Sequence, residues 1–407
     1  MTNIAIIGCG ASGMMAALAA TDNNAKVTIF EYRDEAALKI LSTGNGRCNI
    51  SNRKIEEDAY YCDDRALVKS FLKKFSPDDT LAYFEKLGLM FDYKEDLVYP
   101  ASFQASTVRN LLLNELKRRN VTVRTGHIVD KITAARNGFI VSSEKRQEVF
   151  DKVILACGSY AGIKKNKRLP GDIDGYSLAY HLGHTIKPVK PSLCGINCVE
   201  DYIKSAAGTR IFGKISAFRS DGVKASDSGE IQITDYGISG IPVFNISHIV
   251  SAADSTVNLV LDLYPDKKEA EIKDFALKRA KNYIGRTVNE YCLGMLNSGI
   301  YDMFLAIFKI SGETKINEDN IEILAERISS LKNISLSSKG SRSFENAQCC
   351  LGGIPLDEID ENCMSRKNKG LYICGEMLDI DGICGGYNLQ WAWTSGHIAG
   401  IGASINA

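Results

Sequence analysis

The opening segment of the chain, residues 3–33, limits the possible folds more strongly than any other part of the sequence. It reads "NIAIIGCGASGMMAALAATDNNAKVTIFEYR". The apolar run Ile4–Ile7 suits a buried parallel strand, and the following "MMAALAA" favours a helix. A second apolar stretch, "KVTIFE", ends in an acidic residue. Strand, glycine-rich turn, helix and strand in this order predict a dinucleotide-binding unit.

The glycine spacing explains how such a unit would hold its ligand. Gly8, Gly10 and Gly13 form the pattern G-x-G-x-x-G. Gly8 allows a tight turn, Gly10 lets the backbone approach a pyrophosphate, and Gly13 lets the helix pack closely on the strand. The helix N-terminus offers partial positive charge to the phosphates, and Glu31 is placed to bind a ribose 2′-hydroxyl. A glycine-rich turn without a ligand is the alternative.

The segment around residues 121–158 favours a flavin over a nicotinamide as the resident nucleotide. The sequence contains no second G-x-G-x-x-G, so a dedicated nicotinamide domain is not expected. Short strands separated by turns predict a small β-meander here. It leads into "VILACGSYAG", which is similar to a segment of flavoproteins of the glutathione-reductase type.

The C-terminal segment carries a second signal of the same kind. "LYICGE" predicts a buried strand, and "GGYNLQWAWTSGHIAG" predicts a helix with small residues on one face. Gly385 and Gly386 leave the first amides of that helix uncovered, which predicts an anion site suited to a reduced flavin ring. A small-residue helix that merely packs on the sheet is the alternative. We therefore expect one Rossmann-like FAD-binding domain assembled from both chain ends.

The middle of the chain is predicted to be an insertion. "CGINCVE", "RIFGKISAFRS", "GEIQITDYGISGIPVFNISHIV" and "TVNLVLDLY" alternate in polarity and predict a β-barrel-like domain. Helical patterns follow from Pro265 to about Asn333. The predicted fold is α/β, with FAD-binding residues 1–190 and 350–407, a β-rich insert at 191–264 and 335–349, and a helical insert at 265–334.

The overall composition is that of an ordinary globular protein without a charge bias. Lys plus Arg and Asp plus Glu both number 49, which argues against nucleic acid and anionic membranes as partners. No run of about 18 apolar residues occurs, and the N-terminus enters a strand directly, so we expect a soluble, cytoplasmic protein. The 12 cysteines lack the spacing of metal ligands. We therefore expect them to be reduced thiols, and we expect no metal site. A redox or ligand role for Cys349 and Cys350 is the alternative.

These motifs together resemble one flavoprotein family. The chain looks like the family that contains the aminoacetone oxidases and the bile-acid 3-dehydro-Δ4,6-reductases, over nearly its full length. The resemblance rests on "GCGASG", "KILSTGNGRCNISN", "GDIDGYSLAYHLGHTI", "ITDYGISGIP" and "GEMLDIDGICGGYNLQWAWTSG". The segment "QCCLGGIP", residues 348–355, departs from the family, in which small polar or β-branched residues commonly replace the two cysteines.

The resemblance implies FAD as the cofactor and a loop at residues 42–49 that lies against it. Within this loop, Arg47 would pair with a phosphate or a substrate carboxylate. The cofactor-binding residues expected from the motifs and the resemblance are Gly8, Gly10, Ala11, Ser12, Gly13, Glu31, Lys39, Gly44, Asn45, Gly46, Arg47, Cys48, Asn49, Val129, Ala156, Cys157, Gly158, Gly375, Glu376, Asp379, Gly385, Gly386, Tyr387, Asn388 and Leu389.

Three functions are compatible with this reading. The first is an FAD-dependent reductase that takes electrons from transiently bound NADH or NADPH and reduces a C=C bond conjugated to a ketone in an apolar small molecule, of the 3-oxo-4-ene steroid or bile-acid type. The second is an amine oxidase of the aminoacetone type, which uses O2 and produces peroxide. The third is a non-catalytic FAD-binding protein. No histidine has a partner at catalytic spacing, so no catalytic residue is named, and His184 is expected to be a capped or surface residue.

Overall fold

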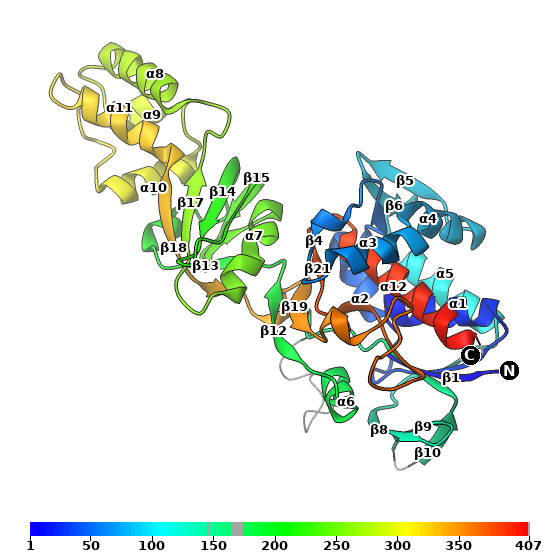
Figure 1. The fold of residues 1–407 in the computed structure, drawn as a ribbon. Helices are drawn as coiled ribbons and strands as arrows, with labels where there is room; N and C mark the ends of the chain where they lie inside the picture. Colours follow the sequence, from blue (N-terminus) through cyan, green and yellow to red (C-terminus); the bar gives the residue numbers. More distant parts are fainter. Residues whose placement is uncertain (145, 164–173, 406–407) are drawn as a thin grey trace. The chain divides into compact units, whose positions relative to one another are not determined.

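The computed structural model describes residues 1–144, 146–163 and 174–405. The chain forms two compact units, one of residues 1–190 and 348–407 and the other of residues 191–347. Figure 1 shows both chain ends, coloured blue and red, within the first unit. Residues 171–173, which open the motif "GDIDGYSLAYHLGHTI", lie outside the described residues. The bounds of the three predicted domains stay a prediction.

The first unit is built on a parallel sheet with the strand order β20-β11-β1-β2-β7. β1 lies at its centre, where Ala5 is aligned with Val153 of β11 and with Thr28 of β2. β20 pairs with β11 although most of the chain separates them in sequence. The prediction of one Rossmann-like sheet from both chain ends is therefore confirmed. The five strands are β1 (Asn3–Ile7), β2 (Lys26–Phe30), β7 (Thr122–Arg124), β11 (Lys152–Leu155) and β20 (Leu371–Ile373).

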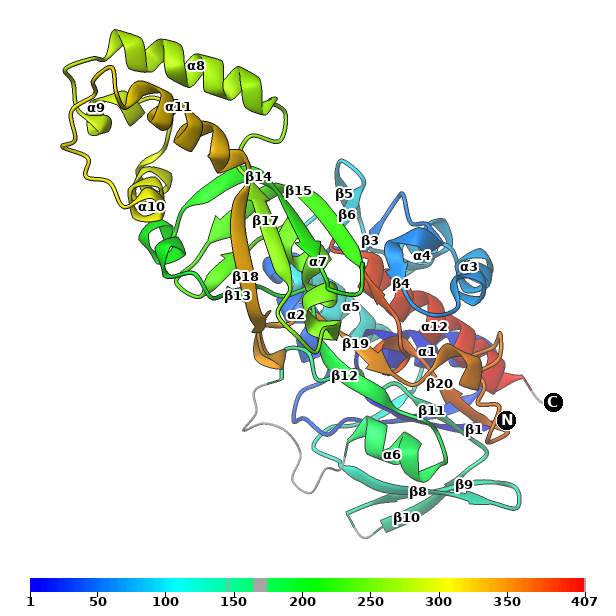
Figure 2. The same cartoon turned by 60° about the vertical axis from the view of Figure 1, so that its left-hand side comes forward.

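Two helices from opposite ends of the chain pack against each other beside this sheet. α1 (Ala11–Asp22) and α12 (Tyr387–Ser404) run side by side in Figures 1 and 2. A Cβ atom at Gly396 would lie 2.4 Å from the carbonyl oxygen of Ser12, and one at Gly400 would lie 2.2 Å from that of Ala16. The small residues of the C-terminal helix are required because the two backbones touch.

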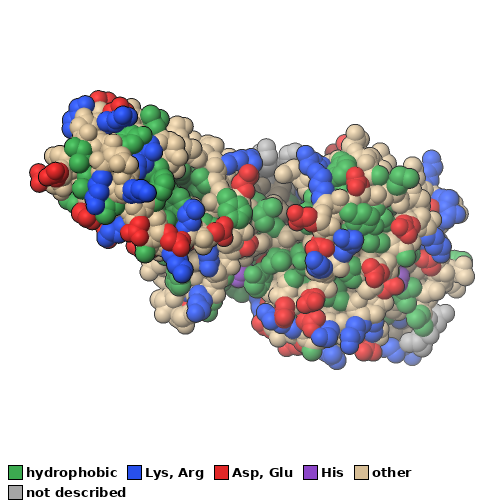
Figure 3. Space-filling model, turned by 90° about the horizontal axis from the view of Figure 1, so that it is seen from above, with side chains coloured by type: hydrophobic (Ala, Val, Ile, Leu, Met, Phe, Trp, Pro, Cys, Tyr) green, Lys and Arg blue, Asp and Glu red, His purple; other side chains and the backbone are tan. Residues whose placement is uncertain are grey.

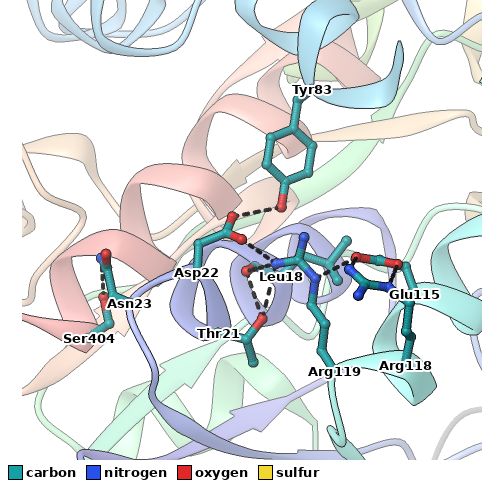
Figure 4. A network of polar contacts seen from close by, with 9 residues as sticks. All are labelled: Leu18, Thr21, Asp22, Asn23, Tyr83, Glu115, Arg118, Arg119 and Ser404. Carbon is teal, nitrogen blue, oxygen red and sulfur yellow. Dashed lines mark hydrogen bonds and ion pairs between the residues drawn. The ribbon is translucent and has the colours of Figure 1, made fainter. Parts of the chain in front are cut away.

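An arginine just after α5 fixes the C-terminal end of α1 (Figure 4). Arg119 donates to the carboxylate of Asp22 at 2.5 Å and to the carbonyl oxygen of Leu18 at 2.8 Å. Its Nε donates to Glu115 at 2.6 Å, and Tyr83 donates to Asp22 from α4 at 3.1 Å. Hydrogen bonds from Arg118 and Arg119 outweigh the effect of burial and lower the pKa of Glu115 to about 2. These bonds set the position of the helix whose other end faces the glycine-rich turn.

Smaller elements surround the central sheet. Strands β8 to β10 form the antiparallel meander that the sequence predicts. β12 leads out of the first unit and pairs with β19, which leads back into it. The remaining elements of this unit are α2 (Leu38–Ser42), α3 (Arg65–Lys74), α4 (Pro77–Lys86), α5 (Ala105–Arg118), α6 (Gly175–His181), β3 (Ser51–Asn52), β4 (Tyr60–Tyr61), β5 (Phe91–Lys94), β6 (Leu97–Pro100), β8 (Val129–Ala135), β9 (Gly138–Ser143), β10 (Arg146–Phe150), β12 (Lys187–Ser192), β19 (Cys349–Gly353) and β21 (Asp381–Gly382).

The second unit contains a closed barrel with the strand order β13-β16-β15-β14-β17-β18, which confirms the predicted barrel. Its interior is filled by aliphatic side chains that are fully buried, among them Ile215, Ile231 and Leu261. The filling follows from the alternation along each strand, which turns every second side chain inward. The strands are β13 (Ile196–Cys198), β14 (Arg210–Phe218), β15 (Lys224–Ile233), β16 (Gly237–Ser239), β17 (Asn258–Asp262) and β18 (Ile334–Ser341).

Helices complete this unit, and one of them corrects the sequence analysis. The stretch "PVFNISHIV" was expected to continue a strand, but it lies in the helix α7 (Ile241–Ala252). Gly240 precedes the helix and Pro242 occupies its first turn, which is a usual helix start, and apolar residues on most faces hide the helical period. The other helices are α8 (Glu269–Asn282), α9 (Val288–Cys292), α10 (Ser298–Phe308) and α11 (Ile321–Ser329), and they share one hydrophobic core with the barrel.

Candidate functional site

The glycine-rich turn after β1 has the geometry of a dinucleotide cradle. Gly8 has a positive φ of 105°, and a Cβ atom there would lie 2.3 Å from the carbonyl oxygen of Ala156. A Cβ atom at Gly13 would lie 2.0 Å from the carbonyl oxygen of Gly8. Gly10 differs, because no atom of the described chain lies within 4 Å of its Cβ position. Two glycines are thus needed by the protein itself, and the third leaves room for a ligand.

The start of α1 has no acidic group or side-chain cap that would compete with an anion. Gly10 precedes the helix without a side-chain hydrogen bond, and the first turn contains no acidic residue. The predicted residues Ala11, Ser12 and Gly13 form this turn. Amide groups at a helix start carry partial positive charge and bind phosphate groups. The turn is therefore suited to a pyrophosphate.

Glu31 lies at the end of β2, next to the same turn. Its carboxylate accepts hydrogen bonds from the backbone N–H groups of Cys9 at 2.9 Å and Arg33 at 3.0 Å. Burial raises the pKa of Glu31, and these two N–H groups offset part of the rise. The N–H of His127 donates to the carbonyl oxygen of Glu31 at 2.9 Å, two residues before Val129 begins β8. The structure thus brings Glu31 and Val129 to one side of the turn.

A polar cluster occupies the carboxyl edge of the sheet, where three strands end. Lys39, after β2, forms an ion pair of 2.5 Å with Glu376, which follows β20. Ser159, after β11, donates to the same carboxylate at 2.9 Å. Burial lowers the pKa of Lys39, but the charge and hydrogen bond of Glu376 outweigh this effect and raise it. Ligands of open α/β sheets bind at this edge. Ser159 was missed in the sequence, although it directly follows the recognised "ACG".

The two adjacent cysteines of β19 belong to this cluster. Cys349 and Cys350 are buried, and all 12 cysteines of the chain are free. Burial raises the pKa of the Cys350 thiol to about 11, the hydrogen bond from Ser159 lowers it, and the charge of Glu376 raises it further. The thiol therefore remains protonated at neutral pH. The departure from the family pattern thus places two neutral thiols beside Lys39 and Glu376.

Asp379 is held by protein groups rather than left open. Its carboxylate accepts from the backbone N–H of Gly352 at 2.9 Å and from Lys187 at 2.7 Å. A Cβ atom at Gly352 would lie 2.2 Å from the carbonyl oxygen of Pro188. Asp379 therefore fixes the glycine pair that ends β19 against the segment after β20. Its expected contact with a cofactor stays a prediction.

The loop "TGNGRCN" meets the start of the C-terminal helix. With its amide oriented by the hydrogen-bond network, Asn49 accepts from the backbone N–H of Gly386 at 3.1 Å and donates to the carbonyl oxygen of Ser51 at 2.8 Å. Cys48 and Asn49 are buried, whereas the preceding residues are exposed. The exposed part comprises Gly44, Asn45, Gly46 and Arg47. Gly44 and Asn45 have left-handed backbone conformations, with φ of 56° and 55°.

The first turn of α12 presents its backbone rather than its side chains. Gly385 and Gly386 have φ of 121° and 93°, and a Cβ atom at Gly386 would lie 2.5 Å from the carbonyl oxygen of Ser51. The side chain of Asn388 makes two hydrogen bonds to the backbone of Gly382, at 2.8 and 2.9 Å. The first turn has no acidic residue. The amides of residues 387–389 are therefore suited to the anion site that the sequence predicts.

The other predicted residues lie beside these elements. Gly375 starts the turn after β20, and a Cβ atom there would lie 2.5 Å from Oγ of Ser12. Cys157 and Gly158 follow β11, and the side chain of Cys157 contacts the carbonyl oxygen of Ile7. Tyr387 is buried, and its hydroxyl donates to the carbonyl oxygen of Lys54, while Leu389 is half-buried. All of the predicted residues lie in the first unit.

His184 corrects the sequence analysis, because it is buried rather than on the surface. Its Nδ1 lies 2.6 Å from Glu358 and its Nε2 lies 2.9 Å from Oγ of Ser365. Ser365 Oγ accepts the backbone N–H groups of Lys367 and Asn368, so its own proton points to His184. Burial lowers the pKa of His184. The order Ser–His–Glu is that of a hydrolase triad, but a serine that is 2% exposed and accepts two amides is structural.

The charge on the surface matches the neutral composition. Lys and Arg side chains are interspersed with Asp and Glu over the face drawn in Figure 3. No group of three or more His, Cys, Asp or Glu side chains that could hold a metal ion occurs among the described residues. Within the same residues, no helix is long and apolar enough to cross a membrane.

Comparisons with known proteins agree with this geometry. The chain is 37% identical to the 3-dehydro-bile acid delta(4,6)-reductase of Clostridium scindens over 99% of both chains. It is 24% identical to the ribosomal RNA dihydrouridine synthase of Escherichia coli, covering 96% of this chain and 95% of the relative. A 3-ketosteroid-delta4-(5alpha)-dehydrogenase structure from Rhodococcus jostii RHA1 shares the fold with a TM-score of 0.51 and 12% identity, over 100% of this chain and 97% of that one.

The fold and the relatives define an FAD-dependent oxidoreductase. The model of the HI0933-like protein Rossmann domain matches residues 2–402, and the chain belongs to this family. The open space beside Gly10 and the uncapped start of α1 fit the FAD that the family implies. The expected exclusion of nucleic acid is not supported, since a relative is named for its action on ribosomal RNA.

Proposed function

We propose that this enzyme reduces a C=C bond conjugated to a ketone, in a steroid or bile-acid type substrate, with NADH or NADPH as the electron donor. The observation that carries the proposal is the 37% identity, over 99% of both chains, to an enzyme named as a 3-dehydro-bile acid delta(4,6)-reductase. Such a substrate has its double bonds in conjugation with a ketone at position 3. The nicotinamide would bind transiently, since the sequence has no second dinucleotide motif.

Bound FAD would supply the hydride transfer, and the chain would supply binding, orientation and charge. The glycine-rich turn and the start of α1 would hold the pyrophosphate, and Glu31 would hold the adenosine ribose. The amides at the start of α12 would face the developing negative charge of the ring system. The predicted loop at residues 42–49 would cover the site, with Asn49 joining it to Gly386.

The cluster at the carboxyl edge would provide the positive charge next to the reacting groups. Lys39 is 40% exposed along its side chain, and its raised pKa keeps it protonated at neutral pH. Glu376 and Ser159 fix its position. A cation at this place would favour the enolate-like charge that develops when a conjugated ketone is reduced. The neutral thiols on β19 add no further negative charge beside the Lys39–Glu376 pair.

The proposal is tested by steady-state turnover of the FAD-loaded enzyme. Consumption of NADH or NADPH should depend on a 3-oxo-4-ene steroid, and the steroid product should gain two hydrogens by mass spectrometry. Aminoacetone should give no peroxide. Peroxide formation from aminoacetone, without any reduction of the steroid, would instead favour the amine oxidase.

A second candidate function is the reduction of uridine in RNA. It is favoured by the 24% identity to a ribosomal RNA dihydrouridine synthase over 95% of that relative. Uracil also contains a C=C bond conjugated to a carbonyl group, so both candidates require the same chemistry from the cofactor. The neutral charge of the chain offers little attraction to phosphates. Turnover with ribosomal RNA in place of the steroid, read as dihydrouridine by mass spectrometry, separates the two.

A further inference from the structure

The antiparallel meander of β8, β9 and β10 forms a small layer beside the parallel sheet (Figures 1 and 2). One face of the meander is turned to that sheet, and it begins with an apolar cross-strand pair, Phe139 and Phe150. Phe150 packs edge-on against Phe30 of β2, with ring centres 6.0 Å apart. Two further cross-strand pairs follow on the same face: Val141 with Glu148, and Ser143 with Arg146. This face therefore becomes polar toward the β9–β10 turn.

Arg124 at the end of β7 meets the polar part of this face. Its guanidinium donates two hydrogen bonds to the carboxylate of Glu148, and its guanidinium carbon lies 5.2 Å from the ring centre of Phe30. The hydrogen bond and charge of Arg124, together with the charges of Arg146 and His127, outweigh burial and lower the pKa of Glu148. Two guanidinium groups thus face one carboxylate, and positive charge is in excess.

These side chains line a pocket of about 560 Å³ in the first unit. This volume lies in the range of small-molecule sites and is far larger than a bare ion needs. None of the described lining residues is apolar, so the pocket suits a hydrophilic molecule. The lining residues are Arg124, His127, Ser143, Arg146, Gln147 and Glu148.

Two hydrogen-bond donors of this pocket have no acceptor in the described part of the chain. Ser143 is 7% exposed, and its hydroxyl oxygen is buried without a hydrogen-bond partner there. Arg146 is exposed, and no carboxylate of the described residues lies within 4.0 Å of its guanidinium. A buried polar group without a partner is unfavourable and uncommon. Because Ser143 and Arg146 lie opposite each other on neighbouring strands, both donors serve the same end of the pocket.

We propose that Arg146 and Ser143 bind the phosphate group of a small hydrophilic molecule of the sugar-phosphate kind. A guanidinium group matches phosphate through two parallel hydrogen bonds, and the serine hydroxyl adds a third donor. Glu148 engages Arg124, which leaves Arg146 as the guanidinium for the ligand. The amide of Gln147 is suited to a sugar hydroxyl. The inference does not rest on the proposed reductase function, in which this pocket takes no part.

The test is calorimetric titration of the FAD-loaded enzyme with ribose 5-phosphate, ribose and inorganic phosphate. Ribose 5-phosphate should bind, and ribose should bind at least about tenfold more weakly because it lacks the charged group. Arg146→Gln should weaken the binding of ribose 5-phosphate at least about tenfold, and Ser143→Ala should weaken it a few-fold. Inorganic phosphate that binds as tightly as the ester would identify the free ion as the natural ligand, and weaker binding would identify the ester.

Arg136 provides the matched control. It is an exposed arginine in the turn between β8 and β9 of the same meander, and it does not line the pocket. Arg136→Gln removes the same charge and should leave the binding of ribose 5-phosphate unchanged. Equal weakening by Arg136→Gln and Arg146→Gln would overturn the inference. Equal binding of ribose and ribose 5-phosphate, or no binding of either phosphate-bearing probe, would overturn it as well.

The flavin content separates this pocket from the cofactor site. Ser143 lies opposite Val129, which is one of the residues predicted to contact FAD. If the pocket binds a separate ligand, Arg146→Gln should keep its FAD after gel filtration while it loses affinity for ribose 5-phosphate. Loss of FAD together with that affinity would show that Arg146 serves the cofactor, and it would overturn the inference.

Discussion

The two units of this enzyme differ in what their sequences must satisfy. In the nucleotide unit, backbones touch at Gly8, Gly13 and Gly396, where an added Cβ atom would lie 2.0–2.4 Å from a carbonyl oxygen. In the barrel unit, the core is a set of aliphatic side chains such as Ile231 that other apolar residues of similar size can replace. Backbone contact therefore fixes residue identity at these glycines of the first unit, whereas side-chain volume governs the barrel core of the second. This difference explains why the motifs of the first unit are so much easier to recognise.

The largest expected effect separates two glycines of the same motif. Gly13→Ala places a methyl group against the backbone of Gly8, so the variant should not fold stably or retain FAD. In Gly10→Ala the added methyl group has no atom of the described chain within 4 Å, and φ at this position is a permissive −88°. This variant should therefore fold normally but bind FAD at least tenfold more weakly. Thermal melting and flavin content after gel filtration measure both effects. Equal stability of the two variants would contradict the distinction.

The barrel core should respond in proportion to the volume removed. Ile231→Val should cost about 0.5–1.5 kcal/mol of unfolding free energy and Ile231→Ala about 2–5 kcal/mol. Because Ile231 lies in the second unit, both variants should keep their bound FAD while folded. Urea unfolding and the flavin spectrum are the measurements. Loss of FAD from the folded Ile231→Val variant would contradict this expectation.

Two neighbouring arginines test whether the end of α1 is held by one buried side chain. The Arg119 side chain is 13% exposed and holds the end of α1, whereas that of Arg118 is 71% exposed. Arg119→Met should cost about 1–3 kcal/mol because it removes the hydrogen bonds that a mostly buried guanidinium makes to Asp22, Glu115 and the carbonyl oxygen of Leu18. Arg118→Met should have a smaller effect, because the Arg118 side chain is exposed and its ion pair is screened by solvent. Urea unfolding of both variants checks the order, and a larger cost for Arg118 would refute it.

The smallest effect is a pH dependence that arises from His184. Its pKa is lowered in the folded state by burial, so the unfolded chain takes up a proton at a higher pH than the folded one. Stability from this group is therefore present above the unfolded pKa of about 6.5 and is lost as the pH falls below it. The slope reaches at most about 1.4 kcal/mol per pH unit. His184→Gln should flatten the stability profile between pH 7 and the folded pKa, whereas His181→Gln, which changes an exposed residue, should not.

The nucleotide unit was predictable from sequence because its features are local. The βαβ unit, the glycine turn and the small-residue helix each lie within one short segment. The contact of Asn49 with Gly386 and the shared carboxylate of Ser159 and Lys39 were not predictable, because the partners lie on separate segments that only the fold brings together. His184 was misjudged for the same reason, since Glu358 and Ser365 follow far later in the chain.

The sequence predicted the barrel of the second unit but not every element around it. Alternating polarity in β14 and β15 was enough to indicate an antiparallel barrel. The helix α7 was missed because its apolar faces give neither a strand period nor a helix period, and only Gly240 and Pro242 mark its start. The contact of the Arg342 guanidinium with the Tyr236 ring could not be seen in sequence, because it depends on the closure of the barrel between β13 and β18.

The account is tested most directly by an anaerobic experiment with the purified, FAD-loaded enzyme. NADH or NADPH is added first and the visible flavin band is followed, and a 3-oxo-4-ene steroid is added once the band has bleached. The account predicts rapid bleaching by a nicotinamide and recovery of the band by the steroid without oxygen. A band that neither nicotinamide bleaches, or that recovers only when air is admitted, would contradict it.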